Sequence, residues 1–255
     1  MLKVVKYILT DIIRNKVVVG YTLLLLVVSL SLFSLEDNPQ KGVLSLLNVI
    51  LYIVPLVSVI FSTIYLYNSA EFIELLVSQP IRRRSIWSGI FAGLAISLIA
   101  AFVAGVGIPL LFYRRDSVSL LLFAVGVLLT LIFVSLAMVA AVRSRDKARG
   151  IGASVLMWLY FSAVFDGLVL FLVFQFADYP LEKGVMVLTG FNPIDLARIL
   201  VLLQLDVSAL MGYTGVVFKD FFGTAIGMAI SLFVLLCWVI VPLIYSIRRF
   251  EKKDL

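Results

Sequence analysis

The chain has 255 residues, of which 63% are hydrophobic and 14% are charged, and its mean hydropathy is +1.15. These values exclude a soluble domain, because such a domain would expose most of its apolar surface to water. The sequence has no histidine and a single cysteine, Cys237, which excludes Ser-His-Asp hydrolysis, a His- or thiolate-ligated metal site and a disulfide framework. We therefore expect no metal site in this chain.

Long apolar runs dominate the sequence, and most exceed the ~20 residues that a helix needs to cross a hydrocarbon core of ~30 Å. Barrel strands would alternate their faces over about 10 residues, whereas these runs are apolar on all sides. The sequence predicts an all-α polytopic membrane protein with a single transmembrane domain over residues 1–255. Its six transmembrane helices are expected at about residues 17–35, 44–67, 85–113, 117–142, 150–177 and 221–247.

The distribution of Lys and Arg residues predicts the orientation in the membrane. Six spans put both termini on one side; if this side faces the cytoplasm, fifteen basic residues fall in inner segments and six in outer ones. The net charge of +6 then reflects the positive-inside rule and attraction to anionic membrane lipid. We expect both termini to be cytoplasmic, and we expect no nucleic-acid partner.

Residues 2–15 predict an amphipathic helix in front of the first span. Apolar residues recur there at helical spacing, with charged and polar residues on the other faces. The helix is expected to lie flat on the cytoplasmic leaflet. The residues expected on its apolar face are Val5, Ile8, Leu9, Ile12 and Ile13.

Residues 68–84 form a polar interlude between the second and third spans. Asn68 can cap a helix, and Glu71 follows three residues later, as in a capping box. Glu71 and Glu74 fall in the first turns, where the helix dipole favours negative charge. Pro80 should end the helix after about three turns. The sequence thus predicts a short cytoplasmic helix followed by an arginine triplet.

Two interpretations of each cytoplasmic loop stay open at this point. The short helix could rest among lipid headgroups, or its apolar face could press on another protein. The residues expected on that face are Phe72, Leu75 and Leu76. The loop after the fourth span either offers positive charge to a soluble partner or is simply solvated. Its arginines are Arg143, Arg145 and Arg149.

Asp166 is the candidate for a functional polar residue within the membrane. It lies about 16 residues, or roughly 24 Å of helix, from the cytoplasmic end of the fifth span. A carboxylate at that depth costs a few kcal/mol unless it faces a cavity or a partner. If the helix tilts or ends early, Asp166 lies near the outer headgroups instead. Both placements are compatible with the sequence.

The outer stretch 178–220 is too apolar to be a free loop. Asn192 is expected to be a helix N-cap, with Pro193 at the first helical position and Asp195 at the third. Asp195 and Arg198 can form a pair at i, i+3. The helix that follows must bury its apolar residues, so we expect it to be either interfacial or re-entrant.

The order of these elements resembles the ABC-2 type transporter permeases. In that family the first helix is the connecting or elbow helix, and the helix between spans two and three is the coupling helix, which seats in a groove of the ATPase subunit. The runs at 71–83 and 192–198 are similar to the NosY-like permease of the nitrous oxide reductase maturation system. The residues that the resemblance assigns to ATPase coupling are Glu71, Phe72, Glu74, Leu75, Leu76, Arg82 and Arg83.

The resemblance implies a permease subunit that has no ATPase site of its own. The chain contains no Gly-x-x-x-x-Gly-Lys-Ser/Thr loop that could bind nucleotide phosphates. ATP and Mg²⁺ would therefore bind to a NosF-like partner ATPase, and this chain would bind no cofactor. Six spans are half a translocator, which implies a second copy of the chain. The resemblance also implies a NosD-like outer accessory protein and a location in the bacterial cytoplasmic (inner) membrane.

A NosY-like permease would move a sulfur-containing species or aid copper-site assembly of nitrous oxide reductase. The lack of histidine and the lone Cys237 argue against direct copper transport. The first alternative is an ABC-2 permease that exports lipid, polysaccharide, drug or peptide. The second is an ion-coupled secondary transporter with Asp166 as its coupling carboxylate. A membrane enzyme is disfavoured because the sequence has no cluster of His, Asp or Glu at ligand spacing.

Overall fold

The computed structural model describes residues 2–35, 39–113, 115–176, 182–205 and 224–252. Every regular element in these ranges is a helix. Within them, six helices are long and apolar enough to cross a membrane, which confirms the predicted all-α polytopic class. These helices are Lys16–Leu35, Lys41–Asn68, Arg83–Tyr113, Ser117–Arg143, Lys147–Gln175 and Ile226–Glu251.

Two of the six spans contain a π-helical turn. The uninterrupted spans are α2 (Lys16–Leu35), α3 (Pro39–Asn68), α7 (Ser117–Arg143) and α13 (Ala225–Glu251). The third span is divided into α5 (Arg83–Phe102), η1 (Val103–Gly107) and α6 (Ile108–Tyr113). The fifth is divided into α8 (Lys147–Leu159), η2 (Tyr160–Val164) and α9 (Phe165–Gln175). Residues 221–223, where the last span was expected to begin, lie outside the described residues.

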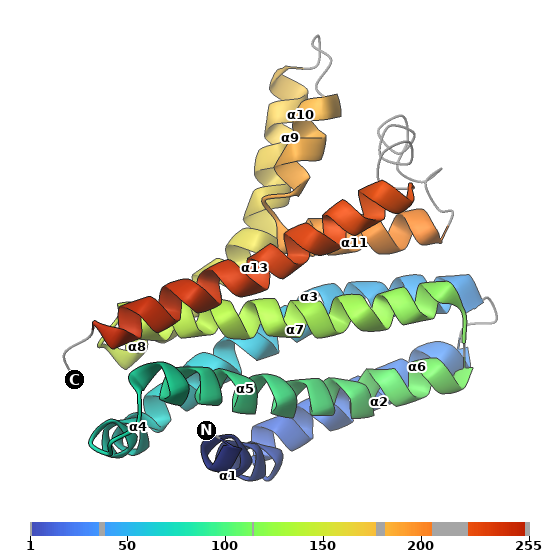
Figure 1. The fold of residues 1–255 in the computed structure, drawn as a ribbon. Coiled ribbons are helices and arrows are strands. Elements are labelled where there is room, and N and C mark those ends of the chain that lie inside the picture. The colour runs from blue at the N-terminus through green and yellow to red at the C-terminus, as the bar shows by residue number, and fades with distance from the viewer. Residues whose placement is uncertain (1, 36–38, 114, 177–181, 206–223, 253–255) are drawn as a thin grey trace.

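The helices α2, α3, α5, α7 and α13 run alongside one another as a bundle (Figure 1). α7 occupies its centre and packs against α3, α5, α8 and α13. All residues from 132 to 138 of α7 are buried, which fits a helix that is apolar on every face. At one end of the bundle lie α1 (Leu2–Ile13), α4 (Ala70–Val77), the start of α8 and the end of α13 (Figure 1). The first and last described helices therefore end on the same side.

The N-terminal helix α1 packs on α5 along a narrow stripe. The buried residues of this stripe are Val4, Ile8 and Ile12. A Cβ atom at Gly93 of α5 would lie only 2.6 Å from Ile8 Cγ2, so the glycine allows the two helices to approach closely. Of the residues predicted on the apolar face, Ile8 and Ile12 are buried and Ile13 is exposed. The helix packs mainly on α5, which covers only residues spaced four apart.

The short helix α4 differs from its prediction in length and in its cap. It has eight residues, about two turns instead of three. The N-cap is Ser69 and not Asn68, and no side chain caps the helix. Asn68 is the last residue of α3, and its Oδ1 accepts a hydrogen bond from Lys147 Nζ at 2.7 Å. The capping-box prediction failed because the preceding span stays helical as far as Asn68.

The helix α11 (Pro193–Gln204) lies inside the bundle, against α3, α7 and α13. Its buried apolar residues include Ile194, Ile199 and Leu203. The first turn of α11 lies beside Phe161 in the fifth span. At the other end of α11, Gln204 Nε2 lies 3.5 Å from Ser117 Oγ, which is at the end of α7 far from α4. Its 12 residues cover about 18 Å, roughly half the thickness of a membrane. α11 is thus a half-length helix that packs along the bundle between the level of Phe161 and that of Ser117.

Candidate functional site

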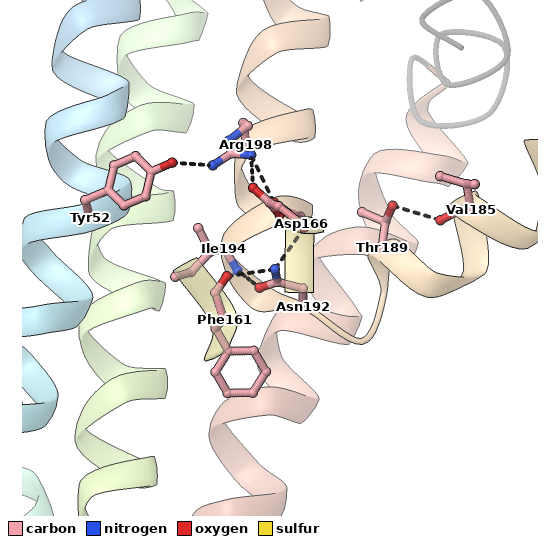
Figure 2. Close-up of polar contacts among 9 residues, drawn as sticks. Tyr52, Phe161, Asp166, Val185, Thr189, Asn192, Ile194 and Arg198 are labelled. Carbon is pink, nitrogen blue, oxygen red and sulfur yellow. Dashed lines mark hydrogen bonds and ion pairs between the residues drawn. The ribbon is translucent and has the colours of Figure 1, made fainter. Parts of the chain in front are cut away.

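The N-terminus of α11 is fixed by the side chain of Asn192, which is completely buried (Figure 2). Its Oδ1 accepts a hydrogen bond from the Ile194 amide at 3.0 Å, which confirms the predicted N-cap. Its Nδ2 donates to the Phe161 carbonyl at 2.9 Å and to Asp195 Oδ2 at 2.8 Å. One amide side chain therefore joins α11 to the fifth span and orients the carboxylate at the third helical position.

The Phe161 carbonyl is available to Asn192 because of the π-helical turn η2. In an α-helix this carbonyl would accept a hydrogen bond from the amide of Phe165, four residues later. In η2 the Phe165 amide donates to Tyr160 instead, five residues back. The turn therefore leaves a buried backbone acceptor for the side chain of Asn192. No pattern in the sequence predicted this turn.

Arg198 connects three helices through its guanidinium group (Figure 2). Its Nη1 lies 3.1 Å from Asp166 Oδ2 of α9 and 3.1 Å from Asp195 Oδ1 of α11. Its Nη2 donates to Tyr52 Oη of α3 at 3.2 Å. The predicted i, i+3 pair of Asp195 and Arg198 is thus confirmed, and Asp166 and Tyr52 complete a network of five side chains together with Asn192.

The network lies level with the middle of the second span. Tyr52 lies near the middle of α3, about 20 Å along the helix from Pro39 and about 24 Å from Asn68. Because Arg198 contacts both Tyr52 and Asp166, the carboxylate lies near the same level, between the two ends of α3. Its depth in the membrane stays a prediction. The side chains of Arg198 and Asp166 keep 24% and 31% of their surface exposed, so the network borders open space.

The network contains more acidic than basic side chains. Two carboxylates share one guanidinium, which leaves one formal negative charge. The carboxylate of Asp195 lies in the first turn of α11, where the positive end of the helix dipole stabilises negative charge. The arrangement can hold α11 against spans two and five, but it contains no nucleophile paired with a base. In the described part of the chain, no group of three or more His, Cys, Asp or Glu residues could hold a metal ion.

At the end of the bundle that also contains α1 and the start of α8, α4 directs charged side chains away from the bundle. Glu71, Glu74 and Leu75 are exposed, whereas Ile73 and Leu76 are buried. Leu75, predicted on the apolar face of this helix, is 65% exposed and does not pack on the bundle. The buried side contains Ile73, which lines the same cavity as Leu66 of α3 and Trp87 of α5.

The other residues predicted to couple to an ATPase face different surroundings. Phe72 is half-buried, and its ring stacks on Tyr7 of α1 with 4.9 Å between centroids. Arg82 is exposed at the N-cap of α5. Arg83 Nη1 donates to the Glu251 carbonyl at 3.2 Å, so Arg83 contacts the last helix of the chain. Only Glu71, Glu74, Leu75 and Arg82 of the predicted set are therefore directed outward.

The loop between α7 and α8 lies next to α4. Arg143, Arg145 and Arg149 are all exposed. Asp146 caps α8 by accepting hydrogen bonds from the amides of Ala148 at 2.7 Å and Arg149 at 3.3 Å. The loop is attached to the end of α3 by the bond between Lys147 and Asn68 described above. The structure thus brings the two predicted cytoplasmic segments together at one end of the bundle.

The sequence did not indicate how the end of α13 is held. The ring of Trp87 in α5 stacks on Phe250 with 4.2 Å between centroids, and its Nε1 donates to Ser246 Oγ at 3.2 Å. Arg84 forms an ion pair with Glu251. These contacts join residues about 160 positions apart. No local pattern around Trp87 distinguishes it from other aromatic residues near a membrane surface.

In the described part of the chain, six helices long and apolar enough to cross a membrane define the class as a multi-pass membrane protein. A family model described as "ABC-2 family transporter protein" matches residues 47–255, which is most of the chain. The chain therefore belongs to the ABC-2 family and is the membrane permease subunit of an ABC transporter, a class that acts together with an ABC ATPase subunit. No curated protein matches the sequence.

Proposed function

We propose that this permease receives force from its ATPase through the exposed face of α4. The observation that supports this role is the division of α4 into two faces. Glu71, Glu74 and Leu75 are exposed, and the opposite side, with Ile73 and Leu76, packs against the bundle. Because α4 directly connects spans two and three, a displacement of its outer face moves both spans.

The proposal places the α4 end of the bundle in the cytoplasm. This end contains the exposed arginines of both connecting loops, in line with the positive-inside rule. Both termini are then cytoplasmic, in the inner membrane of a bacterium. Two copies of the chain and two ATPase subunits form the transporter, because six spans supply half of a translocation path. ATP and Mg²⁺ bind to the ATPase and not to this chain.

For the cargo, we propose the NosY-like assignment: a sulfur-containing species, or help with the copper site of nitrous oxide reductase. Its support is the similarity of runs 71–83 and 192–198 to that group. The second run supplies Asn192, Asp195 and Arg198, which position α11 at mid-depth, where a conduit has to open. A NosF-like ATPase and a NosD-like outer protein complete the system. Copper itself would need other ligands, since this chain has no histidine and one cysteine.

A different cargo class is supported by one other observation. An apolar groove of about 350 Å³ lies along α3 near the start of α2. Its lining is almost entirely hydrocarbon, as an acyl chain requires. The apolar residues in it include Val17, Leu56, Val57, Ile60, Phe61 and Ile64. This groove favours an ABC-2 permease that exports a lipid.

Deletion of the gene in a host that makes nitrous oxide reductase separates the two cargo classes. The NosY-like assignment predicts a reductase whose copper-sulfur centre is missing from its absorption spectrum and returns on complementation. A normal spectrum together with a changed lipid distribution would support the lipid exporter. Reconstitution tests the permease role itself, since transport should require the ATPase. Transport by the isolated chain without ATPase would contradict it.

A further inference from the structure

A cavity of about 320 Å³ lies at the α4 end of the bundle. It is formed by the ends of helices α3, α4, α5, α7 and α13, which are distant in sequence. Its apolar lining is provided by Leu66, Ala70, Ile73, Trp87, Ala141, Val142 and Phe250. Glu74 and Arg145 bring opposite charges to the same cavity, and both residues are exposed. An apolar interior beneath charges of both signs is typical of a site for protein and not of a lipid-facing groove.

Two walls of the cavity are held in place before anything binds. On one side, Trp87 and Phe250 line the cavity and stack on each other, and Trp87 also donates to Ser246. On the other side, Tyr67 Oη donates to the Ser144 carbonyl at 3.0 Å, which joins the end of α3 to the loop after α7. A preformed cavity loses little conformational entropy when it is filled.

The cavity is continuous with the exposed face of α4. Glu74 belongs to both, since it is exposed on α4 and also lines the cavity. Ala70, one helical turn earlier, is likewise exposed and lines the cavity. A protein that covers the outer face of α4 therefore also covers the mouth of the cavity.

We propose that the cavity receives a large apolar side chain from the partner ATPase, and that an acidic residue beside it pairs with the exposed arginines of the loop at 143–149. This inference rests on the proposed docking of the ATPase on α4, and it adds a second contact. The volume suits one or two side chains, not a whole helix. The charge argument is that the segment 143–149 contains three exposed arginines and Lys147 against a single acidic residue, Asp146, and that Arg145 lines the cavity. Because Phe250 of α13 forms one wall, the inserted side chain connects the ATPase to the last span as well as to spans two and three.

The test fills the cavity from within and measures binding of the co-expressed ATPase to the purified full-length chain. Ala70→Trp places an indole at the mouth, and Ala141→Phe fills the floor from α7. Each should lower the affinity for the ATPase by at least about tenfold, as expected for the loss of a central apolar contact. The matched control is Gln79→Trp, which adds an indole at an exposed position after α4 that does not line the cavity. Its affinity should stay within about twofold of the wild type.

The outcomes separate this inference from the proposed function. Wild-type affinity in both filled variants, together with lost binding in Leu75→Arg, would overturn the cavity as a contact and leave docking on α4 intact. If the wild-type chain does not bind the ATPase at all, the proposed function fails. Thermal unfolding of each variant without ATPase, equal to that of the wild type, shows that lost binding is not lost folding. Native mass spectrometry that finds a phospholipid on the wild type and none on Ala70→Trp would assign the cavity to lipid and overturn the proposal.

Discussion

Arg198 of α11 and Asp166 of α9 form an ion pair across 32 positions of sequence, with 3.1 Å between Nη1 and Oδ2. The same guanidinium contacts Asp195 and Tyr52, so it connects α11 to spans two and five. The two partners of this pair are not equivalent. Loss of Asp166 leaves Arg198 paired with Asp195, whereas loss of Arg198 leaves two carboxylates facing each other at mid-depth.

Arg198→Met should therefore destabilise the protein more than Asp166→Asn does. Breaking a fully buried pair costs 3–5 kcal/mol, and the partial exposure of this pair reduces the expected loss to about 2–3 kcal/mol for Arg198→Met. For Asp166→Asn, which leaves Arg198 with a carboxylate, we expect about 1 kcal/mol. Unfolding in detergent, followed by the reaction of Cys237 with a thiol dye, measures both. Equal losses would contradict the shared-guanidinium arrangement.

The same Asp166→Asn variant tests whether the carboxylate acts in transport. A reconstituted complex with Asp166→Asn that transports at the wild-type rate would assign Asp166 to stability alone. Tyr52→Phe is the matched control, since it removes one hydroxyl from the same guanidinium and changes no charge. We expect a loss of about 1 kcal/mol or less for it.

Asn192→Ala should be among the most damaging single changes in α11. It removes the N-cap, at about 1 kcal/mol, and leaves the buried Phe161 carbonyl without this donor, at about 1–3 kcal/mol. Asn192→Ser is the control, because a serine can keep the cap but is too short to reach Phe161. The loss of stability in Asn192→Ser should equal only the contribution of the unpaired Phe161 carbonyl. If the two variants unfold alike, the cap contributes nothing measurable.

Local patterns were enough to predict the spans and the start of α11. The length of an apolar run predicts a span, and the order Asn192-Pro193 predicts a helix start, without any knowledge of tertiary contacts. The contact between Arg198 and Asp166 could not be predicted, because it depends on how α9 and α11 pack and the two residues are far apart in sequence. The turn η2 was also missed, since no residue type marks a π-helical turn.

At the α4 end of the bundle, local features were again predicted from the sequence and tertiary contacts were not. Pro80 and the polar residues around it were enough to predict a short helix between spans two and three. Its cap and its length were predicted incorrectly, because the preceding span holds Asn68 in helical conformation. The burial of Ile73 and Leu76, with Leu75 exposed, depends on how α4 packs on its neighbouring helices. The stacking of Trp87 on Phe250 is a tertiary contact between the third and last spans, and the sequence around each residue does not encode its partner.

Gly93→Ala should loosen the N-terminal helix. A methyl group there would lie within 2.8 Å of two side-chain carbons of Ile8, so α1 must shift, at about 1–3 kcal/mol. The combination with Ile8→Ala should recover most of that loss, because it removes the atoms in the way. Gly20→Ala is the control in α2, where a Cβ meets nothing within 4 Å and helix propensity alone should stabilise by up to about 1 kcal/mol. Additive losses in the double variant would exclude the contact between α1 and α5 as the cause.

Glu71→Arg should abolish stimulation of ATP hydrolysis by the permease without affecting its stability. Glu71 is exposed on the outer face of α4, so the charge reversal changes only what a partner meets there. Phe72→Arg should abolish stimulation too, but it also removes the stacking on Tyr7 and should lower the unfolding temperature. The matched control is Lys41→Glu, a charge reversal at an exposed residue near the other end of α3. Full stimulation by Glu71→Arg in reconstituted complexes would remove this face of α4 from the coupling route.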